Sequence, residues 1–100
     1  MKLIDIARVI RSKNAGPTTL TVDLMFNDQE GFQRALGAST LKAEAIALLY
    51  GLEPSQVEVS PYPPAVAIKI VMDRKMVAGD PGDRDVYGAQ QHAPLLGLDV

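Results

Sequence analysis

The sequence Thr19-Leu20-Thr21-Val22-Asp23-Leu24-Met25-Phe26 carries an apolar side chain at every even-numbered position. Its odd-numbered positions include two threonines and an aspartate. Successive side chains of a β-strand point to opposite faces, so this period of two predicts a strand with one face on a core.

The residues before this strand predict a second one. The segment Val9–Lys13 is separated from it by Ala15-Gly16-Pro17, a plausible reversal between two antiparallel strands. A helical turn within the first ten residues, before any strand, is an alternative, because one helical face would hold Leu3, Ile6, Ala7 and Ile10.

Two helices are predicted after the strand. Asn27 and Glu30 have the spacing of a capping box, which marks a helix start. The buried stripe of this helix would consist of Phe32, Ala35 and Leu36. Gly37 would end it, since glycine readily adopts the left-handed conformation.

The second predicted helix runs from about Leu41 to Tyr50. Ser39 or Thr40 can cap its start, and Gly51 can end it. Its predicted buried face consists of Leu41, Ala45, Leu48 and Leu49.

Two strands are predicted to follow the helices. Val57 and Val59 indicate a short one, which Pro61 must end or confine to a sheet edge because proline has no amide to donate. The segment Val66–Met72 alternates again, and its second set of side chains is mostly small or apolar. That composition predicts a central strand buried on both faces.

The order of two strands, two helices and two strands predicts a single α+β domain over residues 1–100. We expect a small antiparallel sheet of about four strands with two helices on one face. A ferredoxin-like arrangement is left open. Residues 78–100 are rich in turn formers and predict an irregular C-terminal arm, which we expect to dock through Val86-Tyr87 and Leu95-Leu96.

Composition argues against several classes of function. The formal net charge of -2 gives no basis for binding nucleic acid or an anionic membrane. The chain has no cysteine, so thiolate chemistry is excluded. Asp5 interrupts the start of the chain where a signal peptide needs an apolar core, and no apolar run approaches a membrane span. We therefore expect a soluble, cytoplasmic protein.

The first candidate site is the polar segment 11–17. An arginine fork, a lysine charge and a glycine that lets backbone amides approach are suited to a carboxylate or phosphate. The simpler interpretation is a solvated hairpin turn. The candidate binding residues here are Arg11, Ser12, Lys13, Asn14 and Gly16.

The second candidate site is the segment Gly79–His92. Its aspartates lack the spacing of a known cation loop, and Arg84 can neutralise them, so no metal site is predicted. His92, the only histidine, can serve as a general acid or base or fill an ordinary hydrogen-bonded role. The candidate catalytic residues of this segment are Asp83, Tyr87 and His92, and its candidate substrate-binding residues are Arg84, Gln90 and Gln91.

Three segments together resemble the signature of domain-of-unknown-function family 4387. These segments are Arg11–Pro17, Leu49-Tyr50-Gly51 and Gly82–His92, and the resemblance spans nearly the whole chain. It implies association with, or fusion to, large proteins similar to the acyclic terpene utilisation protein AtuA. The segment Arg11–Gly16 is also similar to a turn in the small C-terminal domain of AtuA-like proteins, from which it departs at Lys13 and Asn14.

The resemblance leads us to expect the small subunit of a two-component enzyme with an AtuA-like large subunit. The substrate would be a carboxylate or an acyl-CoA, and the reaction a lyase or hydratase type. In this hypothesis Arg11, Lys13 and Asn14 hold anionic oxygens, while Asp83, Tyr87, Gln91 and His92 position substrate or lock the subunit interface.

Two other functions remain open. The chain can be a non-catalytic interaction module that stabilises a larger partner, with its polar loops as interface anchors. It can also be a self-contained protein that binds a small molecule. The residues identify no cofactor and leave a homo-oligomer open.

Overall fold

The structure is a computed structural model that describes residues 1–74 and 92–100. The main elements, in chain order, are α1 (Leu3–Ile6), β1 (Ala7–Asn14), β2 (Thr19–Phe26), α2 (Gln29–Leu36), α3 (Ala43–Tyr50), β3 (Val57–Tyr62) and β4 (Ala67–Asp73). Short 3₁₀ turns are η1 (Ser39–Leu41), η2 (Pro54–Gln56), η3 (Pro63–Ala65) and η4 (Ala93–Leu95). The predicted strands and helices, and the helical turn near the start, are confirmed.

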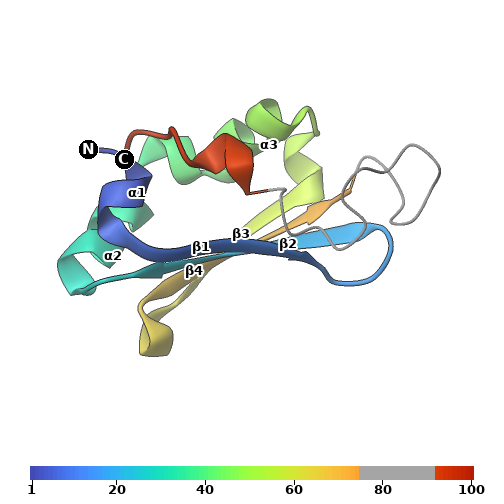
Figure 1. The fold of residues 1–100 in the computed structure, drawn as a ribbon. Coiled ribbons are helices and arrows are strands. Elements are labelled where there is room, and N and C mark those ends of the chain that lie inside the picture. The colour runs from blue at the N-terminus through green and yellow to red at the C-terminus, as the bar shows by residue number, and fades with distance from the viewer. Residues whose placement is uncertain (75–91) are drawn as a thin grey trace.

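Within the described residues, four strands form one antiparallel sheet in the order β1-β2-β4-β3. The helices α2 and α3 lie on one face of it (Figure 1). The predicted α+β class is therefore confirmed. Both helices belong to the connection between β2 and β3, so the element order is not the β-α-β-β-α-β order of a ferredoxin-like fold.

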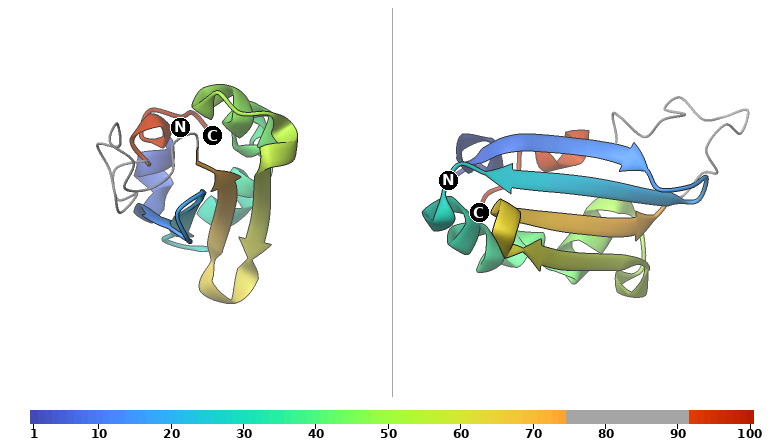
Figure 2. Two further views of the ribbon diagram at one scale, coloured as in Figure 1. Left: turned by 90° about the vertical axis from the view of Figure 1, so that its right-hand side faces the viewer. Right: turned by 90° about the horizontal axis from the view of Figure 1, so that it is seen from below.

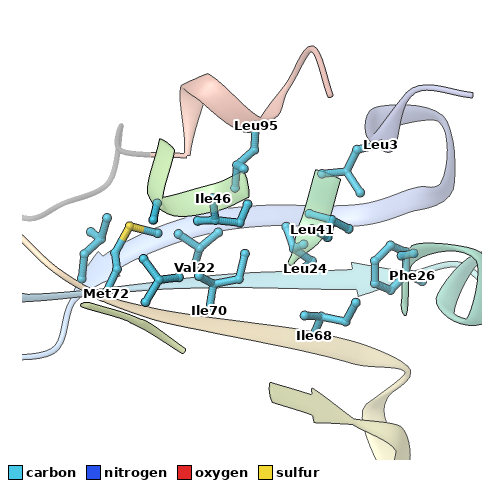
Figure 3. Packing of buried hydrophobic residues seen from close by; sticks show 14 of the residues in the cluster. Leu3, Val22, Leu24, Phe26, Leu41, Ile46, Ile68, Ile70, Met72 and Leu95 are labelled. Carbon is cyan, nitrogen blue, oxygen red and sulfur yellow. The ribbon is translucent and has the colours of Figure 1, made fainter. Parts of the chain in front are cut away.

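The core lies between the sheet and the helices. The even-numbered residues of β2, from Leu20 to Phe26, are at most 3% exposed, as the alternation predicts. They pack with Ile68, Ile70 and Met72 of β4 and with Ile46 of α3 (Figure 3).

The opposite side of the sheet, here called the open face, carries no α-helix of the described chain (Figure 2, right). Lys69 of β4 is exposed there, and Val71 is only partly buried. The prediction that β4 is buried on both faces is therefore wrong for Lys69. Its central position is confirmed, because β4 pairs with both β2 and β3. Strand β3 is an edge strand that contains Pro61, as predicted.

The ends of α2 differ in detail from the prediction. The N-cap is Asp28 rather than Asn27, and its Oδ1 accepts a hydrogen bond of 2.9 Å from the amide of Gly31. Gly37 ends the helix in the right-handed conformation, with φ -85°, so the expected left-handed cap is wrong. Its amide still bonds the Gln33 carbonyl at 3.2 Å, which completes the last turn without a positive φ.

The predicted buried face of α3 is wrong for Leu48 and Leu49, whereas Leu41 is 2% exposed, as predicted. Lys42 adopts an extended backbone, which separates Leu41 from the helix and starts α3 at Ala43, without a side-chain cap from Ser39 or Thr40. The helix then turns Ile46 and Ala47 into the core, while Leu48 is 84% and Leu49 42% exposed. Most residues of this helix are apolar, so the period of its sequence did not identify the buried side. Its predicted end is confirmed, because Gly51 is left-handed with φ 69°.

Residues 92–100 pack onto the helical layer. Leu95 of η4 is fully buried in the core, a contribution of about 2 kcal/mol for a leucine side chain. The amide of Leu3 bonds the Leu98 carbonyl at 2.8 Å, and the amide of Val100 bonds the Met1 carbonyl at 2.8 Å. The two chain ends therefore lie side by side (Figure 1).

Candidate functional site

The polar segment that begins at Arg11 lies mostly in strand β1 rather than in a turn. Strand alternation divides its side chains between the two sheet faces. Ser12 pairs with Val22 and Asn14 with Leu20, so both point toward the helical layer. Arg11 pairs with Asp23 and points to the open face, as does Lys13. The predicted binding residues of this segment are therefore not one cluster.

Ser12 and His92 bring the two predicted polar segments into contact, although they are 80 positions apart. The Ser12 hydroxyl accepts a hydrogen bond of 3.1 Å from the His92 amide. The same oxygen lies 3.4 Å from His92 Nδ1. Ser12 is only 7% exposed, whereas His92 is partly exposed.

This geometry can orient the imidazole ring. Two contacts to one hydroxyl hold both the backbone and the ring of His92 against β1. The Ser12 hydroxyl can donate a hydrogen bond to Nδ1 when the ring carries its proton on Nε2. The Nε2 atom is then the ring nitrogen that does not contact Ser12. A ring held in this way is suited to exchanging a proton with a bound molecule.

The position of His92 depends on the packing of the residues that follow it. The amide of Leu95 bonds the His92 carbonyl at 2.9 Å, which forms the η4 turn. Because Leu95 is fully buried, this turn is anchored in the core. The ring is therefore positioned by tertiary packing and not only by its contact with Ser12.

Asn14 and Gly16 complete the described part of this region. The Oδ1 atom of Asn14 is buried at the end of β1, on the same face as Ser12. Gly16 has φ 101°, and a Cβ built there would meet nothing within 4 Å. Gly16 is thus required by the backbone conformation of the turn and not by a close neighbour.

Arg11 forms an ion pair on the open face. Its Nε lies 3.2 Å from Asp23 Oδ2. Sequence reasoning did not identify Asp23 as a partner, because the pairing depends on the register between β1 and β2. The only local signal was that Asp23 is the one charged residue of this strand.

Asp83, Arg84, Tyr87, Gln90 and Gln91 lie outside the described residues, so their predicted roles stay predictions. In residues 1–74 and 92–100, no three histidine or carboxylate side chains are grouped to hold a metal ion. None of the helices in these ranges is long and apolar enough to cross a membrane.

The segment Leu49-Tyr50-Gly51 forms the end of α3. Burial raises the pKa of Tyr50 to about 12, because the charged phenolate is poorly solvated there. Beside it a shallow apolar groove, here called the α3 groove, is lined by Thr40, Ala45, Leu48, Leu49 and Leu98. Sequence reasoning missed this groove because it assigned both leucines to the core.

The comparisons with known proteins identify a family for this chain. Neither the curated proteins nor the solved structures include a match to this chain. A family model described as "Domain of unknown function (DUF4387)" matches residues 3–99, which is nearly the entire sequence. The chain therefore belongs to the DUF4387 family.

Proposed function

We propose that this chain is the small subunit of a two-component enzyme. Its large subunit would be AtuA-like, as the family resemblance implies, and the complex would be cytoplasmic. The substrate would be a carboxylate or an acyl-CoA, and the reaction a lyase or hydratase type.

The observation that carries this proposal is the contact between Ser12 and His92. The Ser12 hydroxyl lies within hydrogen-bonding distance of both the amide and Nδ1 of His92. Lyases and hydratases need a group that moves a proton to or from the substrate, and an imidazole can both accept and donate a proton. In the proposal His92 supplies this group, and Ser12 positions its ring.

Other predicted residues take separate roles in this proposal. Asn14 lies on the same face as Ser12 and is assigned to holding anionic oxygens of the substrate beside His92. Asp83 and Tyr87 are assigned to positioning the substrate, and Arg84, Gln90 and Gln91 to binding it. Arg11 and Lys13 point to the opposite face, so they are not assigned to the oxygen atoms that His92 serves.

A role beside a larger partner is supported by the exposed leucines of α3. Leu48 is 84% and Leu49 42% exposed, and both line the α3 groove with Leu98. Adjacent large apolar side chains on a surface commonly mark a protein interface. We assign this groove to the contact with the large subunit.

The same groove favours the second candidate function, a non-catalytic module that stabilises its partner. In that case Ser12 and His92 serve only to anchor the C-terminal segment. The two functions make different predictions for a variant that lacks the imidazole but still assembles.

The test is reconstitution of the pair. The tagged full chain is used to recover its partner from the native cell, and the complex is screened with carboxylates and CoA thioesters. His92→Ala should lower kcat by roughly 100-fold or more while the complex remains intact. Gln33→Ala, at an exposed position of α2, is the matched control and should retain full turnover.

Three results would contradict the enzyme proposal. Recovery of this polypeptide alone would remove the large subunit on which it depends. Full turnover by the His92→Ala complex would remove the proposed proton-transfer role. Loss of assembly in His92→Ala, with turnover per assembled complex unchanged, would identify the non-catalytic module instead.

A further inference from the structure

A hollow lies on the open face of the sheet, on the other side of the sheet from His92. It encloses about 350 Å³, a volume in the range of small-molecule sites. Its lining includes Arg11, Asp23, Met25, Tyr62, Ala67 and Lys69.

The strand register builds this hollow from two neighbouring rows of side chains. One row crosses the sheet as Arg11, Asp23, Lys69 and Ser60. Adjacent strands are about 4.8 Å apart, so the backbones of Arg11 and Lys69 lie roughly 10 Å apart, with Asp23 on the strand between them. The next row, Met25, Ala67 and Tyr62, is apolar apart from the tyrosine hydroxyl. The hollow therefore has a charged side and an apolar side.

One wall of the hollow is formed by Pro61 and Tyr62 at the end of β3 and by Ala65 of the turn η3. This turn projects from the sheet on the side away from the helices (Figure 1). Val66, which follows the turn, has φ 51°, a conformation that is rare for a β-branched residue. Its amide bonds the Pro63 carbonyl at 3.0 Å, and its carbonyl accepts from Phe26 at 2.9 Å. These two hydrogen bonds hold the turn η3 between β3 and β4.

The charges in the hollow do not cancel. Asp23 is neutralised by Arg11, whose Nε lies 3.2 Å from its carboxylate. Lys69 makes no ion pair with any residue in the described part of the chain. The lining thus has two cations and one carboxylate, which leaves one positive charge for an anion.

We propose that this hollow binds a small monocarboxylate with an apolar body. The carboxylate is held by the ammonium of Lys69. The apolar body lies over Met25 and Ala67, against the ring of Tyr62. The site belongs to this chain alone, so it does not depend on the proposed large subunit or on His92.

The test is a titration of the isolated full chain with 4-phenylbutyrate, followed through the methyl signals of its methionines by NMR. The Met25 signal should shift and saturate, with a Kd on the order of 1 mM for a ligand of this size. Met72 is buried on the other face and 2% exposed, so its signal should not move. The neutral analogue 4-phenylbutyramide should bind about tenfold more weakly, because it lacks the charge that Lys69 pairs with.

Variants separate recognition at this site from general attraction of an anion. Lys69→Gln should weaken 4-phenylbutyrate binding about tenfold and leave binding of the amide unchanged. Arg8→Gln removes the same charge from an exposed residue outside the lining and should have no effect. The proposal is overturned if the Met25 signal does not saturate, if acid and amide bind equally, or if both variants weaken binding to the same extent.

Discussion

At the scale of single residues, Tyr50 gives the clearest electrostatic consequence of the fold. Burial raises the pKa of Tyr50 to about 12 from an ordinary value of 10.0. Below pH 10 the hydroxyl keeps its proton in the folded and the unfolded chain, so it causes no pH dependence. Above pH 10 the unfolded chain loses this proton first, which favours unfolding progressively up to about pH 12.

The Tyr50→Phe variant should therefore lose less stability between pH 10 and pH 12 than the wild-type chain. The measurement is the melting temperature across this range, and the comparison is between slopes rather than absolute values. Tyr62→Phe is the matched control, because Tyr62 is 58% exposed, and it should follow the wild-type curve. An unchanged slope in Tyr50→Phe would show that this hydroxyl does not titrate with folding.

At the scale of elements, the two main helices end with glycines that have different conformations. Gly51 is left-handed with φ 69°, whereas Gly37 is right-handed with φ -85°. A side chain at a left-handed position brings Cβ close to the following carbonyl oxygen, which costs about 1–2 kcal/mol. A Cβ at Gly37 would meet its nearest neighbour, the Gln33 carbonyl oxygen, at an ordinary 3.7 Å.

Gly51→Ala should therefore lower the free energy of unfolding by about 1–2 kcal/mol. Gly37→Ala should leave it unchanged or raise it by up to about 1 kcal/mol, because alanine restricts the unfolded chain. Urea unfolding of both variants checks this pair. An equal loss in both would mean that Gly37 also needs a positive φ, as its sequence position first indicated.

At the scale of the whole molecule, the sheet has one face packed against helices and one open face, and the α3 groove lies on the helical layer. We predict that Leu48→Asp disrupts assembly with the large subunit while the chain stays folded. Leu48 is 84% exposed, so the charge costs little in the isolated chain. In a dry interface the same carboxylate would be desolvated without a partner.

Pull-down of the partner measures this effect, and the circular dichroism spectrum reports folding. The matched control is Ile4→Asp, since Ile4 is a 52% exposed apolar residue of α1 outside the α3 groove. It should assemble normally. Full recovery of the partner by Leu48→Asp would exclude the α3 groove as the docking surface.

The sequence predicted those features that depend on local pattern. The alternation around Val22 predicted β2 and its buried face, Pro61 predicted an edge strand, and Gly51 predicted a left-handed helix end. The sequence did not identify the buried face of α3, because apolar residues occur on most sides of this helix. The extended backbone of Lys42 starts the helix at Ala43 and so decides which residues face the core. The hypothesis placed both polar segments at one substrate, but it did not identify Ser12 as the residue that contacts His92.

The sequence by itself therefore determined the elements, because backbone preferences and side-chain periods act over a few neighbouring residues. Only the tertiary structure decided which side chains share a face and meet. Strand register set Arg11 against Asp23 and left Ser12 on the opposite side, and the burial of Leu95 placed His92 beside Ser12. These contacts join residues up to 80 positions apart, over which no local preference acts, so they follow from packing.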